Sequence, residues 1–138
     1  MIYYIIEKQK IYLIKNNIDK MEFSYKINNN LKTRKKQYSK LAAEHPDKVP
    51  IILERDINCT INKPIKSKYI LSKEITMAEF VKIIREKLEL KPERAIFLLV
   101  NGKHSVTMNE ELGNIYNKHK DEKDGFLYMS YSEEIVYG

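Results

Sequence analysis

The chain of 138 residues contains one cysteine, Cys59, and no pair of cysteines with the spacing of a zinc site. A disulfide framework is therefore excluded, and a structural zinc site is not expected. The three histidines, His45, His104 and His119, are scattered singly, which argues against a metal centre of any kind. No apolar run approaches the roughly 20 residues that a membrane-spanning helix needs, and nothing resembles a secretory signal. We expect a soluble, intracellular globular protein that needs no cofactor.

The composition indicates one folded domain. A hydrophobic fraction of 43% and ten tyrosines exclude a disordered chain, and the length is sufficient for a real core. The net charge of +6 is uneven: residues 26–40 hold six basic residues and no acid, whereas the last twenty residues hold five acids and two lysines. The basic run is either the solvated face of a helix or a surface for acidic partners, anionic lipid or nucleic acid.

The N-terminal part of the chain divides into an extension and a helical region. Residues 1–20 mix isoleucine and tyrosine with lysine and asparagine, a composition that does not decide between a strand and a short helix. Residues 24–43 predict two short helices with a break near residues 28–30. Their apolar stripe is Leu31, Tyr38, Leu41 and Ala42. Strands are expected at residues 49–53 and 69–71, paired as a hairpin around a loop at residues 58–64.

The strongest local signal is the start of a helix at Thr76. Thr76 and Glu79 form a capping box, in which each side chain is expected to satisfy a free backbone N–H of the other. Apolar residues then recur at helical spacing, which predicts an amphipathic helix with one buried face. These residues are Met77, Phe80, Val81, Ile84 and Leu88.

The remainder of the chain alternates strands with turns. The apolar run at residues 95–100 is typical of a central strand covered on both faces, and Asn101-Gly102 predicts a type I′ turn into a short strand. A short helix at residues 109–116 should bury Leu112 and Ile115. Residues 126–131 predict a strand buried on both faces, opened by the turn signal Asp124-Gly125.

This order of elements predicts an α+β fold: a β-grasp roll with two additional N-terminal helices, in which the last strand lies beside the first. We expect an N-terminal extension of unknown role at residues 1–20, a helical subdomain at 21–48, the β-grasp core at 49–131 and a flexible tail at 132–138.

Many separated segments, in the same order along the chain, match one known family. They are Met21-Glu22-Phe23-Ser24-Tyr25-Lys26, Lys48-Val49-Pro50-Ile51-Ile52, Lys68-Tyr69, Thr76, Phe80, Ile84-Arg85, Ala95-Ile96-Phe97, Val100-Asn101, Ile115-Tyr116, His119, Asp124-Gly125-Phe126-Leu127-Tyr128 and Tyr137-Gly138. With these segments the chain resembles the GABARAP and microtubule-associated light-chain-three family of autophagy ubiquitin-like modifiers. The resemblance covers residues 21–138 almost without gaps and makes Met21 similar to the usual family start.

The resemblance implies that Gly138 is joined by an amide bond to the amine of phosphatidylethanolamine. Activating and conjugating enzymes of the autophagy system would perform the chemistry, and this chain would not itself be an enzyme. Glycine suits the reaction because no Cβ hinders its carbonyl. The expected location is the cytoplasm and, after lipidation, the membrane of the autophagosome or another organelle.

The resemblance also implies a surface that binds aromatic-x-x-aliphatic motifs by adding a strand to the sheet. An aromatic pocket would be formed by Gln37, Leu41, Pro50, Ile52, Lys68, Ile70 and Phe126. An aliphatic pocket would be formed by Tyr69, Leu71, Ile75, Phe80, Ile83 and Ile84. Lys66, Lys68 and Arg85 would face acids that flank the motif. Gln37 and Ser72 differ from the acid and the proline that the family often has there.

Other functional classes remain open on the sequence alone. The chain could be an interaction module whose tail is never conjugated, or a family member that decorates another membrane such as that of a plastid. Nucleic-acid binding is not expected, because Tyr38 is the only aromatic among the basic residues 26–40. The sequence shows no catalytic arrangement, and we expect a monomer before conjugation.

Overall fold

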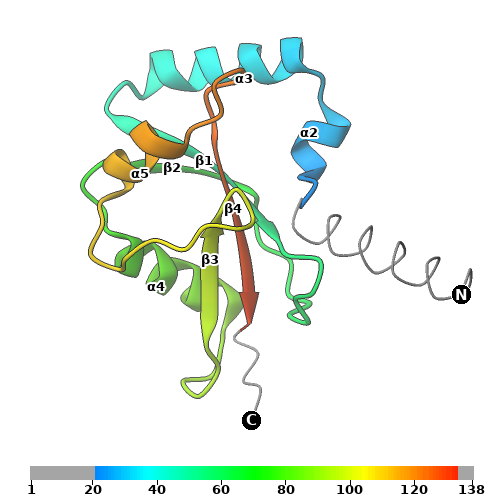
Figure 1. Cartoon of the computed structure of the whole chain (residues 1–138), viewed down its shortest axis with the longest axis vertical. Coiled ribbons are helices and arrows are strands. Elements are labelled where there is room, and N and C mark those ends of the chain that lie inside the picture. Colours follow the sequence, from blue (N-terminus) through cyan, green and yellow to red (C-terminus); the bar gives the residue numbers. More distant parts are fainter. Residues whose placement is uncertain (1–20, 134–138) are drawn as a thin grey trace, which may run out of the picture.

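A mixed four-stranded sheet organises residues 21–133, the part of the chain that the computed structural model describes (Figure 1). Its strands lie in the spatial order β2 (Lys68–Ser72), β1 (Lys48–Arg55), β4 (Leu127–Glu133) and β3 (Ile96–Val100). β1 pairs antiparallel with β2 and parallel with β4, and β4 pairs antiparallel with β3. The last strand thus lies centrally beside the first, as the β-grasp prediction required.

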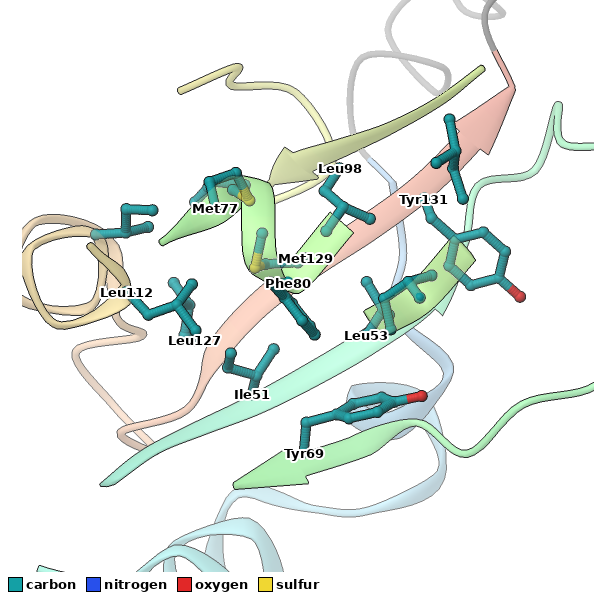
Figure 2. Packing of buried hydrophobic residues seen from close by; sticks show 14 of the residues in the cluster. Ile51, Leu53, Tyr69, Met77, Phe80, Leu98, Leu112, Leu127, Met129 and Tyr131 are labelled. Atoms are coloured by element: carbon teal, nitrogen blue, oxygen red, sulfur yellow. The ribbon is translucent and has the colours of Figure 1, made fainter. Parts of the chain in front are cut away.

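Helix α4 (Met77–Leu88) covers one face of the sheet and builds the main core. The predicted stripe is confirmed, because four of its five members are buried and Val81 is partly buried. Figure 2 shows Met77 and Phe80 packed above Ile51, Leu127 and Met129 of the sheet. This packing fixes α4 across the two central strands, β1 and β4.

The capping box at the start of α4 forms in part. The Thr76 hydroxyl oxygen accepts a hydrogen bond from the backbone N–H of Glu79 at 3.3 Å, as expected of an N-cap. The second half is different from the prediction: the Glu79 carboxylate accepts from the Thr76 hydroxyl at 3.2 Å and not from its backbone N–H. The side chains therefore cap one end of the helix through the threonine alone.

Two N-terminal helices cover the opposite face of the sheet. The predicted break is confirmed, because α2 (Ser24–Asn28) ends at an extended residue, Asn29, and α3 (Leu31–Glu44) begins after Asn30. The Asn30 side chain caps α3 by accepting from the N–H of Thr33 at 2.9 Å. Tyr38 and Leu41 of the predicted stripe pack against a second buried cluster. This cluster contains Phe23, Tyr25, Ile52, Phe126 and Tyr128.

Between β3 and β4 the chain makes a turn and a short helix. Asn101 and Gly102 both have positive φ, 55° and 74°, as the predicted type I′ turn requires. The expected short strand after it is only an isolated bridge between Val100 and His104. Helix α5 (Leu112–His119) starts later than the predicted residue 109, but it buries Leu112 and Ile115 as expected.

The position predicted for β3 is wrong. The apolar run at residues 95–100 led us to expect a central strand, but β3 lies at the edge of the sheet, next to β4 only. Its burial alternates along the strand, and Phe97 is 41% exposed. An edge strand needs apolar side chains only on its core face, and a single exposed apolar residue such as Phe97 is common on protein surfaces.

The final strand is buried over residues 127–131, as predicted, and continues to Glu133. It therefore extends two residues into the predicted tail. The rest of the predicted tail, including Gly138, and the predicted extension at residues 1–20 lie outside the described residues.

Two smaller expectations changed in the structure. Cys59 falls in the loop predicted at residues 58–64, but its side chain is only 8% exposed and belongs to the main core. His104 and His119, distant in sequence, stack with ring centroids 5.7 Å apart. Among the described residues no group of three or more potential metal ligands comes together, and no helix is long and apolar enough to cross a membrane.

Candidate functional site: the edge of strand β2

The free edge of β2 lies between α3 on one face of the sheet and α4 on the other. Within residues 21–133, β2 pairs with β1 alone, so its outer backbone N–H and C=O groups have no strand partner. Lys68 and Ile70 point to the α3 side, whereas Tyr69 and Leu71 pack with the α4 core. Such an edge can accept an extended peptide as an additional strand.

A cavity of about 350 Å³ lies on the α3 side of this edge. Leu41, Pro50 and Ile70, three residues of the predicted aromatic pocket, line it together. Ile52 and Phe126 are fully buried in the second cluster, against which Leu41 packs. They support the wall of the cavity and do not line it.

Lys68 and Gln37, the remaining members of the predicted aromatic pocket, contact each other. The Lys68 Nζ donates to Gln37 Oε1 at 2.9 Å, and the Tyr25 hydroxyl donates to the same oxygen. Lys68 Nζ also lies 5.1 Å from the centroid of the Tyr25 ring, within cation–π distance. The structure thus brings all seven predicted residues to one region of the α3 side.

The cavity includes residues that the sequence analysis did not assign to it. Tyr38 and His45 come from α3 and its C-cap, Lys73 from the turn after β2, and Tyr116 from α5. The Tyr116 hydroxyl donates to the Gly125 carbonyl at 2.7 Å. Tyr116 reaches the cavity because α5 packs against β1 and β2, and no local sequence signal points to that placement.

A buried ion pair holds α3 in place beside the sheet. Arg34 Nε donates to Asp124 Oδ2 at 2.9 Å, and the Asp124 side chain is fully buried. Asp124 also accepts from the backbone N–H of Phe126 at 2.9 Å and from the Tyr128 hydroxyl. Since α3 carries Tyr38 and Leu41, which line the cavity, this network fixes one of its walls.

A second ion pair joins α2 to the same loop before β4. Lys26 Nζ lies 2.7 Å from Asp121 Oδ2. Burial alone would raise the pKa of Asp121, but the hydrogen bonds from Lys26 and from the backbone N–H groups of Asp124 and Lys123 together lower it. Two of the basic residues in the run at 26–40 therefore pair with acids of the chain itself.

The tyrosines of this region are held in the neutral form. Burial raises the pKa of Tyr25 to about 12, and the charge of Asp124 acts in the same direction. Burial also raises the pKa of Tyr128, with a further contribution from its hydrogen bond to Asp124. These hydroxyls therefore act as hydrogen-bond donors at neutral pH.

On the α4 side, the predicted aliphatic pocket divides into a floor and a rim. Tyr69, Phe80 and Ile84 are 2%, 0% and 0% exposed and belong to the core. The rings of Tyr69 and Phe80 meet edge to face with centroids 5.7 Å apart (Figure 2). Leu71, Ile75 and Ile83 are partly buried around them, so an aliphatic side chain would contact these three first.

The basic residues beside the aliphatic site include Lys87, which the sequence analysis did not name. Lys66 Nζ and Lys87 Nζ lie 5.0 and 5.9 Å from the centroid of the Tyr69 ring. The Arg85 guanidinium instead donates to the carbonyls of Lys91, at 3.0 Å, and Arg94, in the loop that leads to β3. Lys87 therefore lies with Lys66 at the Tyr69 ring, a place that the sequence analysis did not assign to it. Its spacing of seven from Phe80 could have identified it.

The C-terminal end of β4 is fastened where the chain leaves the sheet. The Glu133 carboxylate accepts from the Thr60 hydroxyl at 2.8 Å and from Arg94. The hydrogen bond from Arg94 is the largest cause that lowers the pKa of Glu133, and the one from Thr60 acts in the same direction. Gly138 follows five positions later in the sequence.

Comparisons with known proteins agree with this architecture. The family model described as "Autophagy protein Atg8 ubiquitin like" matches residues 32–138. Human microtubule-associated protein 1 light chain 3 gamma is 36% identical over 115 residues, which are 83% of this chain and 78% of the human protein. The crystal structure of Trypanosoma brucei ATG8 superposes with a TM-score of 0.76 at 33% identity, covering 86% of this chain and 100% of that chain. The chain therefore belongs to the Atg8 family of autophagy ubiquitin-like proteins.

Proposed function

We propose that this autophagy ubiquitin-like modifier is joined through Gly138 to phosphatidylethanolamine and recruits proteins that carry an aromatic-x-x-aliphatic motif. The observation that carries the second part is the free edge of β2, which has a cavity on one face and an apolar rim on the other. A cavity with Leu41, Pro50 and Ile70 lies on one face, and the rim of Leu71, Ile75 and Ile83 lies on the other.

The peptide adds a strand to β2, with backbone hydrogen bonds along the edge. Side chains of an added strand alternate between the two faces of the sheet. The two anchors of the motif are at positions i and i+3, an odd spacing, so one anchor reaches each face. The aromatic residue enters the cavity beside Ile70. The aliphatic residue packs against Leu71 and Ile83. Burial of these two side chains supplies most of the affinity.

Conjugation is performed by partner enzymes, and this chain supplies the acyl group. An activating enzyme joins the Gly138 carboxylate to AMP from ATP with release of pyrophosphate. A cysteine thiol of the enzyme then displaces AMP to give a thioester, and the amine of phosphatidylethanolamine displaces the thiol to give the amide. The support for this role is membership of the family and a match of the family model that runs through residue 138.

The proposed function requires three kinds of partner. They are the activating and conjugating enzymes, a membrane that contains phosphatidylethanolamine, and cargo receptors or adaptors that carry the motif. The protein acts in the cytoplasm and on autophagosomes. A plastid or another organelle membrane is the alternative destination. In the alternative without conjugation, the β2 edge alone acts, as a peptide-binding module.

Peptide titration followed by backbone NMR tests the recruitment role. A peptide with the motif should shift the amides of residues 68–72 most strongly, and a peptide with both anchors replaced by alanine should not bind. Ile70→Ala should weaken binding by about tenfold, which corresponds to the apolar contact removed. Phe97→Ala, a matched change on the other edge of the sheet, should leave affinity unchanged. Shifts centred on β3, or equal losses in the two variants, would disprove this site.

A further inference from the structure

The chain carries the aromatic-x-x-aliphatic motif in its own sequence. Four segments have an aromatic residue three positions before isoleucine, leucine or valine. Three of them, at residues 38–41, 80–83 and 97–100, lie inside α3, α4 and β3. Their backbones are held in the fold, so they cannot add a strand to β2. The fourth is Tyr3-Tyr4-Ile5-Ile6, which precedes the part of the chain that the structure describes.

Each anchor of this segment suits one side of the β2 edge. Tyr3 would enter the cavity beside Ile70, and a phenol combines an apolar ring with a polar tip. The cavity offers both environments, because its lining includes the amide side chains of Asn114 and Asn117 as well as apolar walls. Ile6 would pack against the aliphatic rim on the α4 side. Isoleucine and tyrosine are also strand formers, which favours their addition to a sheet edge.

The order of the two sites along β2 gives the direction of the added strand. The aromatic site is formed with Ile70, and the aliphatic site with Leu71 and Ile75, further along the chain. A motif whose aromatic residue comes first therefore runs parallel to β2. The residue that follows the motif then lies beyond the aliphatic site, where β2 ends.

Glu7 follows the motif directly and brings a charge that fits this end of the edge. Its spacing of four from Tyr3 returns its side chain to the cavity side of the sheet. Lys73 follows the end of β2, and Lys48 pairs with that end from β1. Both lysines line the cavity together with one acid, Glu111. Among residues 21–133 neither lysine forms an ion pair, so the Glu7 carboxylate would meet a positive surface.

The length of the chain lets this segment reach the edge of its own domain. Fourteen residues separate Ile6 from Met21, and an extended chain of that length spans up to about 50 Å. Met21 contacts Gly102, in the turn after β3. β3 and β2 are the two edges of the four-stranded sheet, about 14 Å apart at the usual strand spacing. The connection is therefore long enough to pass around the domain to β2.

We infer that residues 3–6 occupy the β2 edge of their own molecule, with Tyr3 in the aromatic site and Ile6 in the aliphatic site, until a partner motif displaces them. The inference rests on the proposed motif binding. A linker of this length gives an effective concentration of the order of millimolar. A motif with a Kd of about 0.1 mM would then fill the edge in about nine molecules of ten.

The sequence around the motif makes the displacement possible. Met1 and Ile2 precede Tyr3, so no acid of this segment reaches Lys66 or Lys68. A partner with acids before its aromatic residue gains those charge-assisted contacts in addition to the two anchors. The segment therefore selects for partners with an acidic flank, because weaker motifs do not compete with it.

Titration of the full chain with a motif peptide that has acids before its aromatic residue measures the competition. The wild type should bind about tenfold more weakly than Tyr3→Ala/Ile6→Ala, because only about a tenth of its edges are open. Tyr12→Ala/Ile14→Ala is the matched control, since it removes the same residue types but Lys15 stands three positions after Tyr12. It should bind as weakly as the wild type. The difference should be independent of protein concentration, as expected within one molecule.

Backbone NMR locates the occupant without a partner peptide. The amides of residues 68–72 should differ between the wild type and Tyr3→Ala/Ile6→Ala, and a synthetic peptide of residues 1–10 added to the variant should move them toward their wild-type positions. Equal affinities of the three chains for the motif peptide, or a difference that grows with protein concentration, would overturn the inference while the motif binding stands. A failure of all three chains to bind the motif peptide would instead remove the proposed function.

Discussion

The ion pair between Arg34 and Asp124 should be the most costly single polar contact to break. The Asp124 side chain is 0% exposed and that of Arg34 is 12% exposed. Arg34→Met keeps the aliphatic stem but leaves a buried carboxylate without its opposite charge. Removal of one partner from a buried pair costs about 3 to 5 kcal/mol. Because Tyr128 and the N–H of Phe126 still donate to Asp124, we expect a value near 3 kcal/mol.

Urea unfolding at neutral pH measures this cost. Lys26→Met is the matched control, because the side chains of its pair with Asp121 are 39% and 17% exposed, and partly exposed pairs contribute at most about 1 kcal/mol. Adding Asp124→Asn to Arg34→Met should cost less than the sum of the two single changes, since it removes the uncompensated charge. Equal losses in Arg34→Met and Lys26→Met would refute the claim that burial makes this pair decisive.

Three further changes test other parts of the structure. Gly125→Ala should lower the free energy of unfolding by at least about 2 kcal/mol in urea titrations, because φ is 90° there and a Cβ would lie 2.7 Å from the Tyr38 ring. Lys87→Glu should weaken binding of a motif peptide with acidic flanks, whereas Arg85→Glu should leave peptide affinity nearly unchanged; isothermal titration distinguishes them. Asp121 has a lowered pKa, so its contribution to stability is complete above the unfolded pKa of about 4 and is lost as pH falls through the folded pKa. Asp121→Asn should therefore show a smaller loss of stability on acidification than the wild type.

The sequence was sufficient for the elements whose signals are local. The Thr76 cap and the spacing from Met77 to Leu88 define α4 because helix periodicity and capping act within a few residues. The type I′ turn at Asn101-Gly102 is equally local, since it depends on the φ values of two residues. The parallel pairing of β1 and β4 is not local, and the order of elements predicted it through the β-grasp arrangement.

The place of β3 could not be derived from its composition. A run of apolar residues indicates burial. An edge strand with an apolar residue at an exposed position has the same apolar run as a central strand, so the sequence does not distinguish the two. Phe97 is that position. The same reasoning placed the end of β4 too early, because Ser132 and Glu133 are polar residues of a strand whose neighbour, β3, is an edge.

The site residues that match the family could be predicted from the sequence. The residues that reach the site through contacts between distant segments of the chain could not. All the residues expected of the aromatic pocket lie in one region, although Ile52 and Phe126 form its support. The walls from α5 and the network around Asp124 depend on long-range packing, for which one sequence holds no signal. The position of Lys87 near Tyr69 depends on which face of α4 meets β2, and a helical wheel anchored on Phe80 would have indicated it.

The central claim is that Gly138 supplies the acyl group of an amide bond to the amine of phosphatidylethanolamine. The most direct measurement combines this chain with activating and conjugating enzymes of the Atg8 system, ATP and liposomes that contain phosphatidylethanolamine. We predict a product whose mass increases by that of the lipid less one water, which sediments with the liposomes and is absent for Gly138→Ala. The same product from Gly138→Ala, or no product from the wild type while a reference Atg8 protein is conjugated, would contradict the account.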